Sequence, residues 1–190
     1  MAGTDHGEAA RRPLIAVIGD GDLDPDHPRI ALAEDVGRAL VDAGFRLLTG
    51  GGGGVMAAAS RGAHRSSRYA HGDVVGVLPG DDASAANPWV DIAIPTGLGH
   101  LRNGIVARCD AVIAIGGRAG TLSELAFAWT LGRLIVACRA GGWAEQVAGT
   151  RIDDRIRHAA VSDDRVFGAD DAAAAIAIVR ARLAAYGRGT

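Results

Sequence analysis

Short apolar runs that favour β-strands alternate with helical stretches along most of the chain, and glycines and turn residues separate them. The expected strands are residues 14–18, 45–48, 74–78, 90–94, 111–115 and 134–138, and the expected helices are residues 28–43, 55–68, 98–108, 121–131 and 171–186. Strands built almost entirely of Val, Ile, Leu and Ala suit a parallel sheet that is covered on both faces. The alternation therefore predicts a three-layer α/β/α sandwich with a Rossmann-like parallel sheet of about six to seven strands.

The chain has 190 residues, of which 48% are hydrophobic, and this size suits one core. We expect residues 13–190 to form a single Rossmann-like nucleotide-binding domain, preceded by a flexible polar tail over residues 1–12. The apolar run at residues 14–18 is too short for a signal sequence or a membrane span. Cys109 and Cys138 lie in apolar segments, as is typical of reduced core thiols. A cytoplasmic protein with no membrane partner is the expectation.

The basic residues exclude several functions. All 20 of them are arginines, so the chain has no lysine. A Walker-type phosphate loop and the Schiff base of a pyridoxal phosphate enzyme both require lysine, and neither can form here. The net charge of −2 and the lack of a long basic run argue against a nucleic-acid partner. The six histidines show no zinc-ligand spacing, so no metal site is expected.

Two glycine-rich turns predict an anion-binding site. Five consecutive glycines, Gly50 to Gly54, follow one expected strand and precede a helix, and residues 116–121 do the same after a later strand. Glycine costs about 0.5–1 kcal/mol relative to alanine inside a helix, so such a run indicates a need for bare backbone, as in close approach to a phosphate. Helix N-termini also supply free amides and partial positive charge. Both turns are expected at the carboxyl ends of the strands, where ligands of such sheets bind.

A third turn, residues 19–22, follows the first strand and has the sequence Gly-Asp-Gly-Asp. It resembles a dinucleotide fingerprint, but Asp24 takes the third glycine position and the nearby carboxylates would repel a pyrophosphate, so NAD is not expected. An EF-hand interpretation fails because Pro25 replaces the turn glycine and Ala31 replaces the bidentate glutamate. Loop and helix-cap roles are the expectation for Asp24 and Asp26.

Several groups of residues together carry a family resemblance. They are Gly50–Gly54 with Met56, Ser60, Gly62 and Ala63, then Gly76–Pro79, Asn87, Thr96, Gly97, Arg102 and Asn103, and the signature Gly-Gly-x-x-Gly-Thr-x-x-Glu at residues 116–124. Over roughly residues 13–140 the chain resembles the LOG-like superfamily, which includes cytokinin riboside 5′-monophosphate phosphoribohydrolases and molybdenum cofactor carrier proteins. Some members carry a misleading lysine decarboxylase label. The segment at residues 96–103 is closer to the carrier branch, because the matching hydrolase segment usually reads Met-His-x-Arg-Lys.

The resemblance implies two functions of different classes. The preferred hypothesis is a hydrolase that cleaves the N-glycosidic bond of a nucleoside 5′-monophosphate to free base and ribose 5-phosphate, with Glu124 and Arg102 as the catalytic residues. The alternative is a non-catalytic carrier, for which the same loops hold the phosphate of a pterin such as molybdenum cofactor. A nucleotide-sensing interaction protein is a third, weaker alternative. No resident cofactor is required, and molybdenum cofactor enters only as cargo.

The expected ligand-binding residues come from the three turns and from the segment that carries Arg102. They are Gly19, Gly51, Gly52, Gly53, Gly54, Met56, Asn103, Gly117, Arg118, Gly120 and Thr121. Arg118 stands where related sequences usually carry glycine, and its guanidinium would contact a phosphate, narrow the pocket or point outward. Glu124 has a structural alternative, since Thr121 and Glu124 also match a capping box. The alternative for Arg102 is a surface salt bridge.

The helix expected at residues 121–131 is apolar nearly all round, which is typical of a helix buried in a core or an interface. At their helical positions we interpret Met56, Phe127 and Trp129 as core or subunit contacts and not as a cofactor-binding motif. The resemblance also implies an oligomer. A homodimer or homotetramer is the expectation.

Overall fold

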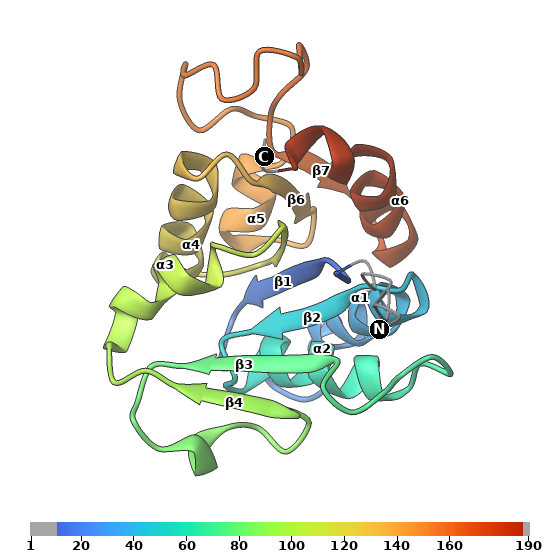
Figure 1. The fold of residues 1–190 in the computed structure, drawn as a ribbon, viewed down its shortest axis with the longest axis vertical. Coiled ribbons are helices and arrows are strands. Elements are labelled where there is room, and N and C mark those ends of the chain that lie inside the picture. Colours follow the sequence, from blue (N-terminus) through green and yellow to red (C-terminus); the bar gives the residue numbers. More distant parts are fainter. Residues whose placement is uncertain (1–10, 188–190) are drawn as a thin grey trace, which may run out of the picture.

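A single parallel sheet forms the centre of the structure, a computed structural model that describes residues 11–187 (Figure 1). Its seven strands have the order β4-β3-β2-β1-β5-β6-β7, and each neighbouring pair is parallel. The strands are β1 (Leu14–Gly19), β2 (Arg46–Thr49), β3 (Val74–Leu78), β4 (Ile92–Pro95), β5 (Ala111–Ile115), β6 (Leu134–Cys138) and β7 (Phe167–Ala169). The Rossmann-like parallel sheet is therefore confirmed, and β7 is the strand that the sequence pattern missed.

Helices cover both faces of this sheet and complete the three layers. The helices are α1 (Pro28–Asp42), α2 (Gly54–His64), α3 (Asn103–Val106), α4 (Ala119–Thr130), α5 (Gly142–Val147) and α6 (Ala172–Arg182), with 3₁₀ turns η1 (Ala83–Ala85), η2 (Gly99–Arg102) and η3 (Leu183–Tyr186). In β1, Ile15 and Val17 pack into the core with α1, α2 and α6, whereas Ala16 and Ile18 pack into the core with α3, α4 and α5. This alternation explains why the buried strands are apolar throughout.

The observed structure differs from the expectations in one predicted helix, in one helix cap and in one additional helix. The helix expected at residues 98–108 is replaced by η2 and the single turn α3, and the positive φ angles of Gly97 (64°) and Gly99 (56°) prevent a regular α-helix from beginning at residue 98. The first turn of α1 is capped by the side chain of His27, which accepts a hydrogen bond from the Arg29 amide, so the cap roles expected for Asp24 and Asp26 are wrong. Helix α5 was not expected from the sequence.

The strand order reverses beside β1, since the chain runs outward from β1 to β4 and returns to the other side of β1 as β5. Ligands of such sheets bind at this reversal, beyond the carboxyl ends of the strands. Of the expected tail, residues 1–10 lie outside the described residues, while Arg11 and Arg12 form ion pairs with Asp110 and Asp73. None of the helices within residues 11–187 has the length and apolar character needed to cross a membrane.

Candidate functional site

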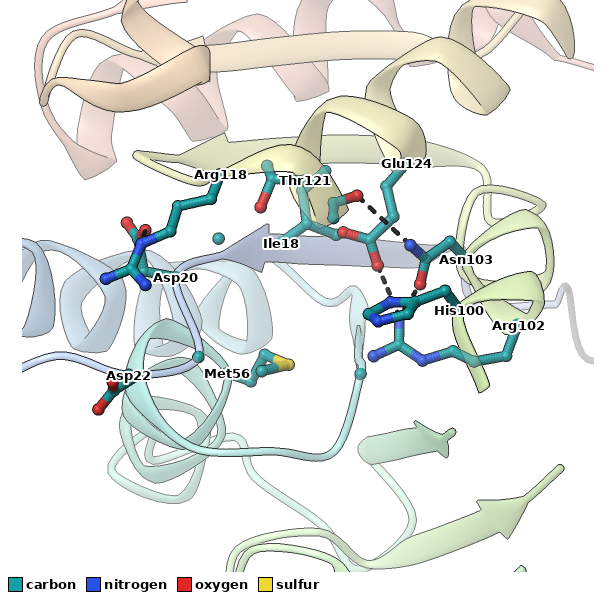
Figure 2. Close-up of a pocket in the computed structure, with 14 residues that line it drawn as sticks. Ile18, Asp20, Asp22, Met56, His100, Arg102, Asn103, Arg118, Thr121 and Glu124 are labelled. Atoms are coloured by element: carbon teal, nitrogen blue, oxygen red, sulfur yellow. Dashed lines mark hydrogen bonds and ion pairs between the residues drawn. The ribbon is translucent and has the colours of Figure 1, made fainter. Parts of the chain in front are cut away.

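A cavity of about 240 Å³ lies at the carboxyl ends of β1 and β5, where the strand order reverses. Figure 2 shows Arg118, Thr121 and Glu124 entering it from the start of α4, opposite His100, Arg102 and Asn103 from the η2–α3 segment. The remaining lining residues are Ile18 and Gly19 at the end of β1, Asp20, Gly21 and Asp22 directly after it, Gly50 and Met56 near the start of α2, and Gly120.

Arg102 and Glu124 form a buried ion pair at one end of this cavity. The Arg102 Nη1 donates hydrogen bonds to Glu124 Oε1 at 2.8 Å and to Asn103 Oδ1 at 2.5 Å. The side chains of Arg102 and Glu124 are only 12% and 9% exposed. Arg102 Nε is also buried and has no hydrogen-bond partner within the described chain, so the guanidinium retains a donor. The pair is therefore not the surface salt bridge that was the alternative for Arg102.

The position of Glu124 in its helix also excludes the capping box. Helix α4 begins at Ala119, two residues before the expected start, and no side chain caps it. Glu124 therefore lies in the second turn and binds Arg102, while Asn103 Nδ2 donates to Ser123 Oγ at 2.7 Å. Burial raises the pKa of the Glu124 carboxyl from 4.5 to about 7, and the neighbouring Arg102 opposes this rise. At neutral pH such a group is present in both protonation states and can donate or accept a proton.

Asp20 joins the two glycine-rich turns. Its carboxylate accepts a hydrogen bond from the Gly117 amide at 2.8 Å and pairs with Arg29 Nη1 at 2.9 Å. Its backbone carbonyl accepts from the Val55 amide at 2.9 Å, in the first turn of α2. Gly54 lies so close that a Cβ there would collide with the Asp20 carbonyl, which explains the last glycine of the run. One buried aspartate thus fixes the start of α2 and the turn before α4.

The structure brings eight of the expected ligand-binding and catalytic residues to the cavity and leaves five outside its lining. Those at the cavity are Gly19, Met56, Arg102, Asn103, Arg118, Gly120, Thr121 and Glu124. Those outside its lining are Gly51, Gly52, Gly53, Gly54 and Gly117. The amide of Gly117 is already bound by Asp20, and the carbonyls of Gly51 and Gly52 accept hydrogen bonds from the Asn87 side chain. These glycines therefore accommodate other parts of the protein.

Gly50 has a similar role at the start of the run. A Cβ at this position would collide with the guanidinium of Arg102, so the bare backbone makes room for that side chain. The sequence reasoning missed Gly50 as a lining residue, and it also missed Ile18, Asp20, Gly21, Asp22 and His100. The available signal was the position of residues 19–22 directly after the first strand, at the carboxyl edge of the sheet.

Comparison with known proteins assigns the chain to a family. Residues 12–175 match the sequence profile of the SLOG cluster4 family. The chain belongs to this family. An uncharacterized protein from Archaeoglobus fulgidus is 39% identical to this SLOG cluster4 chain over 126 residues, which covers 66% of the chain and 79% of the relative.

Two solved structures resemble this SLOG cluster4 protein over nearly their whole length. The molybdenum cofactor binding protein from Rippkaea orientalis is 30% identical with a TM-score of 0.73, and the match covers 91% of this chain and 98% of that one. The molybdenum cofactor carrier protein from Chlamydomonas reinhardtii is 32% identical with a TM-score of 0.72, and the match covers 91% of this chain and 99% of that one. The resemblance to the LOG-like superfamily, and to its carrier branch in particular, is thereby confirmed.

Proposed function

We propose that this protein binds a phosphate-bearing small molecule in the cavity at the start of α4, and that this ligand is molybdenum cofactor or its pterin phosphate, held as cargo. One observation carries the proposal: two guanidinium groups, of Arg102 and Arg118, face the same cavity as the exposed start of a helix. Arginine and a helix N-terminus both favour a phosphate. The two solved structures described above are of proteins that bind or carry this cofactor.

The residues at the cavity fit a cargo that is held by its organic part. No group of three His, Cys, Asp or Glu side chains suited to a metal ion occurs within residues 11–187, and both cysteines are buried away from the cavity. The phosphate and the pterin would therefore provide the contacts, and the metal would keep its own ligands. A volume of about 240 Å³ lies slightly below the roughly 300–1,000 Å³ of most small-molecule sites. The rest of the ligand would extend past the open rim.

Cofactor binding is expected to survive purification. The protein would be isolated from cells that make molybdenum cofactor, and bound pterin phosphate and molybdenum would be quantified per chain. We expect a pterin phosphate that is released on denaturation, and no free base from AMP, GMP, CMP, UMP or IMP. Base release from any nucleotide, combined with no bound pterin, would contradict the proposal and support the second candidate.

That second candidate is the nucleoside 5′-monophosphate phosphoribohydrolase, and one observation favours it. The carboxyl of Glu124 is buried, faces the cavity and has its pKa raised to about 7. A carboxyl of this kind could stabilise the developing charge on a ribose or transfer a proton during cleavage of the glycosidic bond. A carrier needs no such group, so the two candidates differ in what they require of Glu124.

We also propose that two or more copies of the chain associate through an apolar surface beside the cavity. This surface consists of Ile92, Ile94, Leu98, Leu101, Ile105 and Phe127, whose exposed fractions range from 42% to 76%. Ile92 and Ile94 align with Val75 and Val77 and so lie on the face of the sheet that α4 and α5 cover elsewhere. Figure 1 shows β4 at the edge of the sheet. Of the two aromatic residues expected at a core or subunit contact, Trp129 is buried in the core, whereas Phe127 is 42% exposed and belongs to this proposed contact surface.

A charged residue in this surface is expected to separate the copies. Leu101→Asp should convert the oligomer into a monomer in sedimentation experiments, because apolar patches of this kind mark interaction surfaces. Ile156→Asp is the matched control, since Ile156 is 81% exposed but lies in the loop before β7, outside the patch. A wild-type protein that sediments as a stable monomer would refute the association.

A further inference from the structure

We propose that Arg118 determines the charge selectivity of the cavity, so that ligands with a phosphate bind in preference to the same molecules without it. The inference rests on the proposed function, because the phosphate is the group through which the cargo would be recognised. Arg102 also faces the cavity, but it differs from Arg118 because its charge is already offset by the hydrogen-bonded carboxylate of Glu124.

The charged side chains near the cavity form two hydrogen-bonded ion pairs and one longer contact, in which Arg118 Nε lies 3.8 Å from Asp20 Oδ1. Arg102 pairs with Glu124 at 2.8 Å, and Asp20 pairs with Arg29 at 2.9 Å. All four side chains are largely buried. The exposed fractions are 12% for Arg102 and 9% for Glu124, and 4% for Asp20 and 18% for Arg29. Each pair leaves no net charge when both partners are ionised. The charges that remain at the cavity are those of Arg118 and Asp22, which are both exposed.

Arg118 is free to contact a ligand. Its side chain is 76% exposed, and its Nε lies 3.8 Å from Asp20 Oδ1, which is beyond hydrogen-bond distance. Asp20 does not need Arg118 to hold its position, because its other carboxylate oxygen, Oδ2, already accepts hydrogen bonds from Arg29 and from the Gly117 amide. In Figure 2 the Arg118 side chain extends from the start of α4 along the cavity toward Asp20. A guanidinium in this position can donate two parallel hydrogen bonds to a phosphate.

Removal of the Arg118 guanidinium leaves an excess of negative charge at the cavity. Without Arg118, the unpaired charge at the cavity is the carboxylate of Asp22, which repels a phosphate. A ligand that lacks the phosphate is insensitive to either charge. The selectivity for phosphate should therefore depend on Arg118, and part of its loss should be recovered when the charge of Asp22 is removed.

Titrations with ribose 5-phosphate and with inorganic phosphate, followed by NMR, test the inference, and ribose is the uncharged counterpart. Arg118→Gln should raise the Kd for both phosphate ligands about 10-fold or more, since hydrogen bonds to charged groups are the stronger class. The weak binding of ribose should not change. Adding Asp22→Asn to Arg118→Gln should recover about 3-fold or more of the lost affinity, because it removes the remaining repulsion.

Arg38→Gln is the charge-matched control. Arg38 forms an exposed pair with Asp35 on α1 and does not line the cavity, so its loss should leave each Kd within about 2-fold. An unchanged Kd in Arg118→Gln, or no recovery in the double variant, overturns this inference and leaves the proposed function intact. A wild-type protein that binds neither phosphate ligand overturns both.

Discussion

Replacement of Asp20 by alanine is expected to lower the free energy of unfolding by about 3–5 kcal/mol, the usual cost of removing one partner from a buried ion pair. The variant leaves the guanidinium of Arg29, which is 18% exposed, without its carboxylate. It also leaves the Gly117 amide without its acceptor. Urea denaturation of both proteins, with the midpoint and the slope determined separately, would measure the loss.

Asp22→Ala is the matched control for this experiment. Asp22 belongs to the same turn but is exposed, so its removal should change the free energy of unfolding by about 0.5 kcal/mol or less. A loss of less than about 1 kcal/mol in Asp20→Ala would mean that the two glycine-rich turns hold their positions without the carboxylate. The hydrogen bonds of Asp20 would then not be needed to hold the two turns together.

Glu124→Gln is expected to abolish base release if the protein is a phosphoribohydrolase. Removal of one electrostatic contact that acts in the transition state typically costs about 10²- to 10³-fold in kcat. Glutamine keeps the size of the side chain and an oxygen that can accept from Arg102, so the fold should be retained. Base release would be followed by chromatography. Ser123→Ala serves as a control on the same helix turn, because it leaves the Arg102–Glu124 pair in place. A decrease of less than about 10-fold would speak against a catalytic Glu124.

The stability of the wild-type protein should depend on pH through the same carboxyl. The pKa of Glu124 is about 7 in the folded protein and 4.5 without burial, so between these values the folded chain holds a proton that the unfolded chain has lost. Stability attributable to this group is therefore present at acidic pH and declines as the pH rises from 4.5 through 7. The Tm of the wild type minus the Tm of Glu124→Gln should therefore decrease as the pH is raised from 5 to 8. A constant difference would mean that the carboxyl titrates at its ordinary pKa.

Most of the fold could be predicted because apolar periodicity reports burial directly. The six strands expected from the sequence all occur within a few residues of their predicted positions, because strands covered on both faces are apolar throughout and the edge strand β4 is also apolar, although much of it is exposed. Strand β7 has only three residues, and α5 has six, so neither offers enough periodicity to be recognised. The predicted helix start at residue 98 was wrong because the positive φ angles of Gly97 and Gly99 depend on the surrounding loop.

The site was predictable in its location but only partly in its contacts. The glycine-rich turns after strands correctly indicated the carboxyl edge of the sheet. The resemblance indicated Arg102 and Glu124, and both line the cavity at that edge. The pattern could not tell whether bare backbone admits a ligand or another part of the chain. Gly50 and Gly54 make room for Arg102 and for the Asp20 carbonyl, and the acceptor for Gly117 comes from a residue 97 positions earlier. Contacts over that separation in sequence leave no local signature.

The bridge formed by Asp20 has a consequence for the thermodynamics of association. Through Asp20, the turn before α4 and the start of α2 are already held together before a ligand binds. Little conformational entropy should therefore be lost when the complex forms. The cavity should therefore be preorganised, with modest changes in backbone hydrogen exchange when the ligand binds, and selectivity would come from the exposed guanidinium of Arg118 at its edge.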